Sequence, residues 1–370
     1  MSHKKHTKLQ KPIGGKFGRN ELGIMGAPCG EIKALSAILI NSLKAHWNVG
    51  YIDADHNAPE EEGWSALHYG AVTEYVDKVS FKRSDSLNEE PDFRNIDLTL
   101  INANHHKAAT QIAFVHPKKD LAKKQDKLTN VAMVILEDSI EAVPDYLVAH
   151  INNTDVPVYK SSELEKITQF IDGWLRNRIP KLYGLVLAGG KSTRMNSDKS
   201  QLEYHNKPQH KHAIELLENV CEKIFVSSRD EAQSEDFEVA SITDKFIGLG
   251  PYGGILSAFM EEPNVAWLVI AVDLPFLDEA TITNLVEHRN PSKLATCFID
   301  PQNEFPEPLI SIWEPRAYPR MLDFLSKGYS CPRKVLINSD VEVLTDRNVQ
   351  ALTNVNTPEE FNDAIELING

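Results

Sequence analysis

Residues 183–199 read YGLVLAGGKSTRMNSDK and predict a buried strand that runs into a glycine-bearing loop. Gly189 and Gly190 carry no side chain, so backbone amides of the loop can approach a ligand closely. Arg194 and Lys199 then supply positive charge: a guanidinium grips phosphate in a forked geometry, and an ammonium is a movable point charge. A Gly-Gly pair after a strand is by itself often only a turn. Together with both cations, it predicts a loop that holds a triphosphate.

Strands and helices alternate along the rest of the second half. Apolar runs at 223–228, 267–273, 293–299 and 309–313 predict strands, and segments of helical periodicity lie between most of them. This alternation is typical of a parallel sheet covered by helices, because a parallel connection needs a long crossover. The second half is therefore expected to form an α/β domain.

The first half shows the same alternation. Strands are expected at 21–25, 49–55, 97–103 and 131–136, with helices at 32–47, 64–71 and 161–177. The boundary is expected at Arg178-Ile179-Pro180-Lys181, because proline ends the helix before it. We therefore expect two Rossmann-like, three-layer α/β domains, at residues 21–178 and 182–370.

The chain carries no sign of export or of membrane insertion. Residues 1–20, MSHKKHTKLQKPIGGKFGRN, are basic and polar without an apolar core, so we expect a disordered leader and not a secretory signal. No run approaches eighteen apolar residues, the length that spans a membrane. The four cysteines are scattered without C-x-x-C spacing, which fits a reducing compartment. A cytoplasmic location is expected.

Composition also limits the class of partner. The formal net charge is −14, which argues against a polyanion such as DNA. Small phosphorylated ligands remain compatible, because local lysines, arginines and backbone amides hold them. The apolar fraction of 42% is high enough for each half to bury a core.

Asp273 ends the apolar run WLVIAVD and is a candidate metal ligand. Open α/β sheets bind their ligands at the carboxyl ends of the strands, where this aspartate is expected to lie. Magnesium takes one or two carboxylates, with phosphate oxygens and water completing its shell, so a single aspartate is chemically sufficient. The alternative is a helix cap or a turn former, since Asp273-Leu274-Pro275 precedes a bend.

The motif LAGG-x-S-x-R-M-x-x-x-D-K at 187–199 resembles the signature of the molybdenum cofactor guanylyltransferases (MobA), within the wider nucleotidyltransferase group. The resemblance runs from about Leu182 to Ile368. It implies a nucleotidyltransferase fold, similar to the nucleotide-diphospho-sugar transferases, for the C-terminal domain. Two positions depart from the family pattern: Asn196 stands where glycine is usual, and Tyr252 replaces a common leucine. Tyr252 is expected near the base pocket, where it could alter nucleotide choice.

The resemblance also implies a set of site residues. Asp244 followed by GPYGGI at 250–255 is similar to the family's D…GPLGGI element, whose glycines would form a second amide-lined wall at a helix start. The nucleotide-binding set it implies is Leu187, Ala188, Gly189, Gly190, Lys199, Asp244, Gly250, Gly253, Gly254 and Asp273. Asp244 could equally be a solvated turn residue.

Two further segments are similar to the family on the acceptor side. EPLIS at 307–311 resembles the strand that closes the acceptor site, and NVNTPEE at 354–360 matches the closing motif. The resemblance gives Asn354 and Asn356 a role toward the acceptor or the metal. Both asparagines could instead be turn residues before a helix at Pro358.

The resemblance implies transfer of GMP from GTP to the terminal phosphate of Mo-molybdopterin, with Mg²⁺ on Asp273 and release of pyrophosphate. Arg194, Lys199 and Asp273 are the expected catalytic residues, because two anions must be neutralised and aligned. Molybdoenzyme apoproteins or other cofactor-biosynthesis proteins are expected partners. The alternatives are a related transferase with a different base or acceptor (molybdopterin cytidylyl or sugar-phosphate), or a non-catalytic module that delivers the pterin cofactor.

The first half resembles the GTP-binding adaptor MobB of the same pathway, but its phosphate loop is degenerate. Residues 23–30, GIMGAPCG, follow a strand and precede a helix, the context of a phosphate-binding loop. Cys29 and Gly30 occupy the places where such loops carry lysine and serine or threonine. We expect a degenerate adaptor domain, with nucleotide binding left open. The adjacent His105 and His106 are expected to face solvent.

Overall fold

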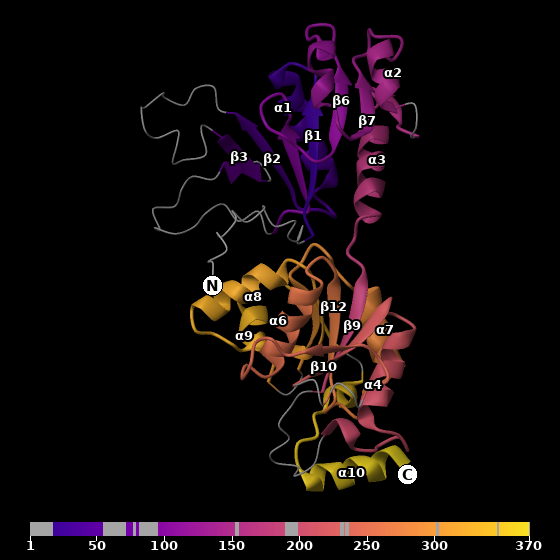
Figure 1. Cartoon of the computed structure of the whole chain (residues 1–370), viewed down its shortest axis with the longest axis vertical. Helices are drawn as coiled ribbons and strands as arrows, with labels where there is room; N and C mark the ends of the chain where they lie inside the picture. Colours follow the sequence, from indigo (N-terminus) through magenta and orange to yellow (C-terminus); the bar gives the residue numbers. More distant parts are fainter. Residues whose placement is uncertain are drawn as a thin grey trace, which may run out of the picture. The chain divides into compact units, whose positions relative to one another are not determined.

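The computed structural model describes residues 18–54, 72–76, 79–80, 95–151, 155–188, 199–229, 233, 237–300, 303–345 and 348–369. For 72–76, 79–80, 199 and 369 it describes the backbone alone. The chain separates into two compact units, one built from Arg19–Ile179 and the other from Pro180–Gly370 (Figure 1). The division falls inside the segment Arg178–Lys181. Residues 1–17 of the expected leader and the helix expected at 64–71 lie outside the described residues.

The first unit is a largely parallel sheet with helices on both faces. Its strands lie in the order β4-β3-β2-β5-β1-β6-β7-β8, and only β3 and β4 run antiparallel to their neighbours. Helices α1 and α3 share one buried cluster with the sheet, and α2 packs with the other face. The elements are β1 (Asn20–Met25), α1 (Cys29–Leu43), β2 (Val49–Ala54), β3 (Val72–Val76), β4 (Val79–Ser80), β5 (Leu98–Asn102), β6 (Gln111–Val115), η3 (Leu121–Lys127), β7 (Val131–Leu136), α2 (Asp145–Ile151), β8 (Val158–Lys160) and α3 (Leu164–Arg176).

The second unit is also a three-layer α/β structure. Its strands lie in the order β11-β10-β9-β12-β14-β13-β15. The elements are β9 (Leu182–Leu187), η4 (Lys199–Gln201), α4 (Gln209–Glu218), β10 (Lys223–Ser228), β11 (Ser241–Thr243), α6 (Pro251–Glu261), β12 (Ala266–Ala271), α7 (Glu279–Glu287), β13 (Ala295–Ile299), β14 (Pro306–Trp313), α8 (Ala317–Ser326), α9 (Pro332–Ile337), β15 (Glu342–Leu344), η5 (Val349–Leu352) and α10 (Pro358–Asn369).

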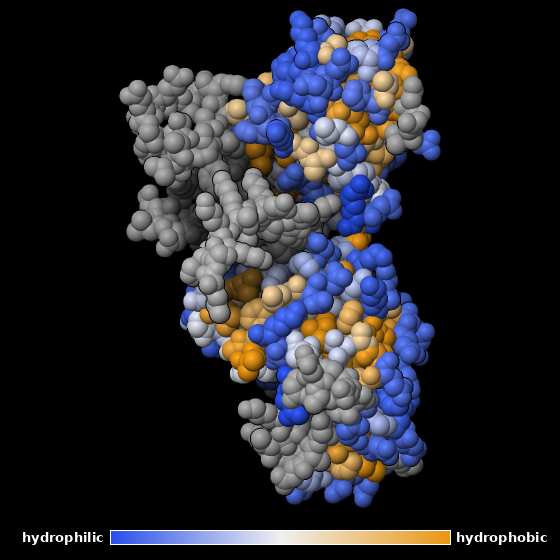
Figure 2. All heavy atoms as spheres, in the orientation of Figure 1, coloured by the Kyte–Doolittle hydropathy of each residue, from blue (hydrophilic) through white to orange (hydrophobic). Residues whose placement is uncertain are grey.

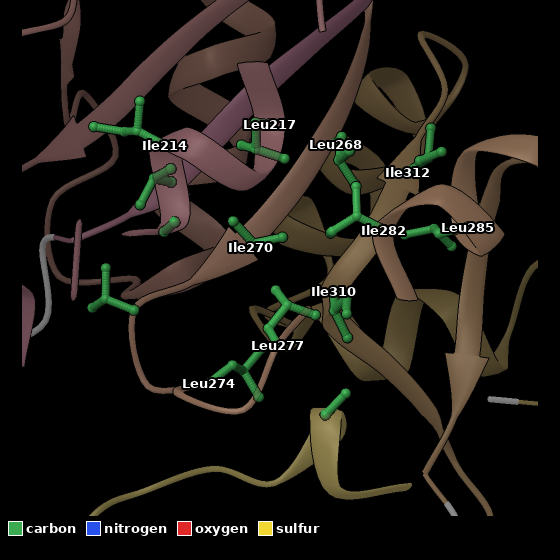
Figure 3. Packing of buried hydrophobic residues seen from close by; sticks show 14 of the residues in the cluster. Ile214, Leu217, Leu268, Ile270, Leu274, Leu277, Ile282, Leu285, Ile310 and Ile312 are labelled. Carbon is green, nitrogen blue, oxygen red and sulfur yellow. The ribbon is translucent and has the colours of Figure 1, made fainter. Parts of the chain in front are cut away.

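Two apolar layers hold this second sheet. On one face, side chains of α4 and α7 such as Leu217 and Ile282 pack against Leu268 and Ile270 of β12 (Figure 3). On the other face, α6, α8 and α9 bury a cluster that includes Trp267. The side chains on the two faces come from alternate positions of β12, as the pleat of a strand requires. Burial on both faces explains why the central strands read as continuous apolar runs.

The parallel arrangement that the alternation of strands and helices predicts is interrupted at β14. This strand runs antiparallel to both neighbours, with Trp313 opposite Trp267 of β12 and opposite Ala295 of β13. The connection from β13 to β14 spans only residues 300–305, which is too short for the crossover that a parallel pair needs. The start of β14 therefore lies at the same edge of the sheet as the end of β12.

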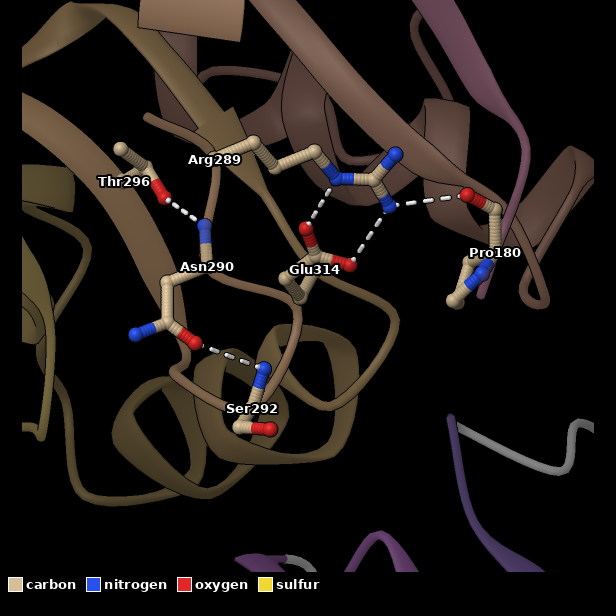
Figure 4. A network of polar contacts seen from close by, with 6 residues as sticks. All are labelled: Pro180, Arg289, Asn290, Ser292, Thr296 and Glu314. Atoms are coloured by element: carbon tan, nitrogen blue, oxygen red, sulfur yellow. Dashed lines mark hydrogen bonds and ion pairs between the residues drawn. The ribbon is translucent and has the colours of Figure 1, made fainter. Parts of the chain in front are cut away.

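A buried ion pair ties together the opposite edge of the sheet. Arg289 donates to both carboxylate oxygens of Glu314, from Nε at 2.7 Å and from Nη2 at 3.0 Å, and Nη2 also donates to the Pro180 carbonyl at 2.8 Å (Figure 4). The Arg289 side chain is 12% exposed and that of Glu314 is fully buried. Because Pro180 precedes β9 and Glu314 follows β14, the pair joins the start of the central strand to the end of β14.

Within the described part of the chain, no helix combines the length and apolar character needed to cross a membrane.

Replacing Arg289 by methionine is expected to lower the free energy of unfolding by about 3 kcal/mol, because Glu314 would keep a buried charge without its partner. Urea unfolding of the full chain measures this change. Lys181→Met is the matched control: Lys181 pairs with Glu222 at 2.6 Å, but their side chains are 63% and 51% exposed. An exposed pair contributes little, so this variant should unfold like the wild type. Equal losses in the two variants would contradict the assigned role of the buried pair.

Candidate functional site

The carboxyl ends of four neighbouring parallel strands form one edge of the second sheet. In the register of the sheet, Leu187 at the end of β9 lies between Ser227 of β10 and Ala271 of β12. The last residue of β10, Ser228, pairs with Thr243, the last residue of β11. The residues that follow these strands therefore gather at one edge, which is where open α/β sheets bind ligands.

The structure describes part of the predicted phosphate loop. Leu187 and Ala188 are buried at the end of β9. Gly189, Gly190 and Arg194 lie outside the described residues, so their roles stay predictions. The backbone of Lys199 begins the short helix η4, and its side chain is not described.

Asp273 lies in the turn directly after β12 and is only partly buried. The alternative that it caps the following helix is wrong, because Asp278 caps α7 by accepting a hydrogen bond from the Thr281 amide at 2.8 Å. The carbonyl of Asp273 accepts a hydrogen bond from the Val355 amide at 2.8 Å. The structure thus brings the predicted metal ligand and the closing motif together.

The closing motif divides into two parts. Glu360 accepts hydrogen bonds from the Asn356 amide at 2.6 Å and the Thr357 amide at 3.2 Å, and the Thr357 hydroxyl accepts one from the Glu360 amide at 3.3 Å. This is a capping box that starts α10. The T-P-E-E segment therefore has a structural explanation. Asn354 and Val355 precede it; Asn354 is exposed beside the Asp273 turn, whereas Val355 is buried.

Tyr204 connects α10 to the same turn. Its ring is 2% exposed and packs edge-on against Phe361 at 4.9 Å between ring centroids. Burial, followed by the charges of Asp273 and Glu360, raises the pKa of Tyr204 to about 12. Phe276, which follows Asp273, packs against the same apolar cluster, so the cluster holds α10 against the segment that contains Asp273.

Asp244 follows β11 and is held within its own turn. Its Oδ1 accepts hydrogen bonds from the Phe246 amide at 2.9 Å and from the Ser257 hydroxyl at 3.1 Å. Ser257 belongs to α6, so Asp244 joins the end of β11 to that helix. Its predicted role toward the nucleotide stays a prediction beside this structural one.

The glycines of GPYGGI allow α6 to lie close to the strand ends. A Cβ on Gly253 would lie 2.4 Å from the Phe246 carbonyl oxygen, and one on Gly254 would lie 2.8 Å from the Ser227 hydroxyl. The amides of both glycines donate to the Gly250 carbonyl, at 2.9 and 3.3 Å. These two positions therefore have a packing role. Gly250 itself has φ 58° and ψ −138°, a conformation that favours glycine, and is exposed before the first turn of the helix.

Tyr252 does not line an open site, so the expectation that it lies near a base pocket is wrong. The side chain is fully buried, and its hydroxyl donates to the Met321 carbonyl of α8 at 2.7 Å. Burial raises its pKa well above the ordinary value. Because a helix turns 100° per residue, a position between Pro251 and Gly253 can face the core while its neighbours face the strand ends.

Glu307 lies at the start of β14 and forms an ion pair with Arg333 of α9 at 2.6 Å. Its side chain is 6% exposed, and burial raises the pKa of its carboxyl despite the arginine. The pair fastens α9 to the strand expected to close the acceptor side.

Several residues at this edge were not predicted. Gln233 is buried, donates from Nε2 to the Ala188 carbonyl at 3.3 Å, and accepts from the Arg229 amide at 2.9 Å. Arg229 is exposed at the end of β10 and adds a cation to the edge. Nothing in the run KIFVSSR distinguishes this arginine from an ordinary surface residue, so the sequence offered no signal for it.

A group of histidines lies beside the Asp273 turn and was also missed. The rings of His205 and His212 stack with 3.9 Å between centroids. His205 Nε2 lies 2.8 Å from the Pro275 carbonyl, and His212 Nε2 lies 3.4 Å from the Leu277 carbonyl. Burial, and next the neighbouring His205, lowers the pKa of His212 to about 4.

The described residues contain no ready-made cluster of three or more His, Cys, Asp or Glu side chains that could hold a metal. The sequence predicts one metal ligand, Asp273. A single carboxylate agrees with a magnesium ion that takes its other ligands from phosphate oxygens and water.

In the first unit, the loop between β1 and α1 makes close contacts with neighbouring segments. Gly26 has φ 106°, and a Cβ there would lie 2.6 Å from the Phe114 carbonyl oxygen. The Sγ of Cys29, the first residue of α1, lies 3.2 Å from Nε2 of His105. His105 is exposed, as expected, whereas His106 is partly buried.

Comparison with known proteins places the second unit among transferases. Residues 184–343 match the family model described as "MobA-like NTP transferase domain". The chain is 34% identical over 182 residues to a "Molybdenum cofactor biosynthesis bifunctional protein" of Synechocystis sp., a match that covers 49% of this chain and 52% of that protein. The chain therefore spans about half the length of this relative.

Two shorter relatives are each named "Probable molybdenum cofactor guanylyltransferase". The one from Flavobacterium johnsoniae is 26% identical over 190 residues, which cover 48% of this chain and 93% of that protein. The one from Pyrococcus horikoshii is 34% identical over 133 residues, which cover 35% of this chain and 67% of that protein.

Gly253→Ala is expected to lower the free energy of unfolding by about 2 kcal/mol, because the new methyl group would force α6 away from the strand ends. Scanning calorimetry of the full chain measures the effect. Gly173→Ala is the matched control: Gly173 lies inside α3, and a Cβ there would meet open space, with no packing partner within 4 Å among the described residues. That variant should gain about 0.5–1 kcal/mol from helix propensity. Equal stability of Gly253→Ala and the wild type would refute the packing role.

The histidine stack predicts a pH-dependent stability. The ordinary pKa of a histidine is 6.5, and burial lowers the pKa of His212 in the folded protein to about 4. As the pH falls, the unfolded chain therefore binds a proton on this ring before the folded protein does. The contribution of neutral His212 to the free energy of unfolding is fully present above pH 6.5 and is lost as the pH falls toward 4. The free energy of unfolding is expected to fall by about 1–2 kcal/mol, which is less than the pKa shift alone would give, because solvent reaches part of the ring and screens its charge. Lys207 and Glu215 also act on the ring, with smaller effects.

Unfolding free energies of the wild type and of His212→Gln, measured between pH 7 and pH 4, test this. Glutamine keeps a donor near the Leu277 carbonyl but does not titrate, so the difference between the two proteins should change with pH. His288→Gln, at an exposed histidine, should show the wild-type dependence. A constant difference between His212→Gln and the wild type across this range would show that the pKa of His212 is not lowered.

Proposed function

The chain belongs, through its C-terminal unit, to the MobA-like NTP transferase family, and from this premise we propose that it is a molybdenum cofactor guanylyltransferase. It transfers GMP from GTP to the terminal phosphate of Mo-molybdopterin and releases pyrophosphate. The observation that carries the proposal is the shared edge of β9 and β12, where Leu187 pairs with Ala271. This register brings the start of the LAGG loop and the turn of Asp273 to the same level of the sheet.

The residues at this edge suit a reaction between two phosphates. The acceptor phosphate attacks the α-phosphorus of the NTP, a P–O bond forms, and the bond to the pyrophosphate leaving group breaks. No side-chain nucleophile is needed, because the task is alignment and neutralisation of charge. Arg194 and Lys199 offset the negative charge on the leaving group, and the amides after Leu187 bind phosphate oxygens.

Asp273 fits a magnesium site in chemical terms. Its carboxylate is a hard oxygen ligand, and it follows a buried strand into a turn that the Val355 amide holds at 2.8 Å. When bound, Mg²⁺ would neutralise phosphate oxygens of the nucleotide. Asn354 is exposed next to Val355, which supports a role for this asparagine toward the acceptor or the metal.

For the first unit we propose a degenerate MobB-like adaptor. The loop GIMGAPCG lacks the lysine of a phosphate loop, and Cys29 makes a contact with His105 instead. We further propose that the protein acts in the cytoplasm and passes the finished cofactor to molybdoenzyme apoproteins or to other proteins of cofactor synthesis.

Supplying GTP, CTP, ATP and UTP separately, with Mg²⁺ and Mo-molybdopterin, tests the donor and the reaction. The proposal expects pyrophosphate release with GTP and little with the other three. Release with CTP alone would make the protein a cytidylyl enzyme. Release with none of them would favour a non-catalytic delivery module.

Asp273→Asn is expected to lower kcat by about 10²-fold or more, because the amide loses the charge that the metal needs. The unfolding midpoint should stay near that of the wild type. Asp340→Asn is the matched control, since Asp340 forms an exposed pair with Lys293 and its side chain is 61% exposed. Wild-type turnover in Asp273→Asn would show that the metal is held elsewhere.

A further inference from the structure

Side chains from one short segment hold the backbone that follows Asp273. The Nε2 of Gln209 donates to the Leu274 carbonyl at 3.2 Å, and the Nε2 of His205 lies 2.8 Å from the Pro275 carbonyl. A carbonyl oxygen can only accept, so His205 must carry its proton on Nε2. These contacts fix the turn between Asp273 and α7 through its backbone.

The same segment holds the backbone next to Lys199. The Nδ1 of His210 lies 2.8 Å from the Ser200 carbonyl and must donate to it. His210 is 2% exposed and Gln209 is 1% exposed, so both bonds are shielded from water. A backbone carbonyl that loses its partner in such a place is costly to bury. One pair of adjacent residues therefore contacts both the Lys199 turn and the Asp273 turn.

The helix that carries this pair is anchored in the core. Gln209 and His210 form the first turn of α4, and Ala213, Ile214 and Leu217 of the same helix are buried against the sheet (Figure 3). The first turn of α4 is thus a rigid support. A shift of either held turn would require this support to move or a buried hydrogen bond to break.

We propose that Gln209 and His210 are positioning residues of the transferase, which set the separation between the backbone at Lys199–Ser200 and the Asp273 turn. The proposal rests on the proposed function, because it assumes that Lys199 and Asp273 act on one nucleotide. Gln209 acts on the Asp273 side and His210 on the Lys199 side. Neither residue is assigned a contact with substrate.

The two sides predict different kinetic signatures. Gln209→Leu removes the donor to Leu274 and should raise the Mg²⁺ concentration for half-maximal activity about tenfold, because the Asp273 turn loses one of the hydrogen bonds that hold it. His210→Phe removes the donor to Ser200 and should lower kcat about 30-fold, with the Mg²⁺ midpoint and the KM for GTP within about threefold of the wild type. A displacement of a catalytic group by about 1 Å lowers reaction rates by factors of about this size.

Conservative replacement and a matched control separate positioning from stability. His210→Asn places an amide donor where Nδ1 lies and should recover kcat to within about threefold of the wild type. His288→Phe removes a bond of the same kind, from Nδ1 to the Asn284 carbonyl at 2.9 Å, at an exposed site on α7. This control should keep wild-type kinetics.

The experiment measures kcat, the KM for GTP and the Mg²⁺ midpoint for the full-length wild type and the four variants, with calorimetric unfolding of each. A wild type without guanylyl transfer overturns the proposed function itself. An active wild type together with wild-type kinetics in folded His210→Phe and Gln209→Leu overturns only the positioning roles. The positioning roles are also overturned if the loss of kcat is explained by a smaller folded fraction of the variant. The same holds if His210→Asn does not recover kcat.

Discussion

The pairing of β9 with β12 and β10 is the constraint on which the second unit depends. Parallel strands in register must end together, so Leu187, Ser227 and Ala271 lie at one level of the sheet. Functional side chains from distant parts of the chain can therefore come together if each of them directly follows one of these strands. The Arg289–Glu314 pair joins the start of β9 to the end of β14 at the opposite edge of the sheet, away from the loops that follow β9, β10 and β12.

Close packing and backbone hydrogen bonds convert this shared edge into a defined site. Gly253 and Gly254 let α6 approach the strand ends within van der Waals contact. Gln209 and His210 hold the turns that follow β12 and the LAGG loop. The Val355 amide adds the closing motif to the same place. At these contacts the groups that hold the turns are backbone amides and the neutral side chains of Gln209 and His210.

The alternation of strands and helices, and the strand-end position of Asp273, could be predicted because apolar runs and parallel topology follow from local pattern. The direction of β14 could not, since it depends on a six-residue connection whose geometry no periodicity reports. Tyr252 was misjudged because its helical face is decided by packing against α8. The spacing of His205, His210 and His212 does not reveal their carbonyl partners, which lie 70, 10 and 65 residues away in the chain.

The central claim is that one nucleotide meets Asp273 and Lys199 at the shared strand edge. A crystal structure of the full chain with GTP and Mg²⁺ tests it most directly. We predict a magnesium ion bound by the Asp273 carboxylate and by phosphate oxygens, with Lys199 and Arg194 in contact with the same triphosphate. A triphosphate bound away from the ends of β9 and β12, or a metal without Asp273 among its ligands, would contradict it.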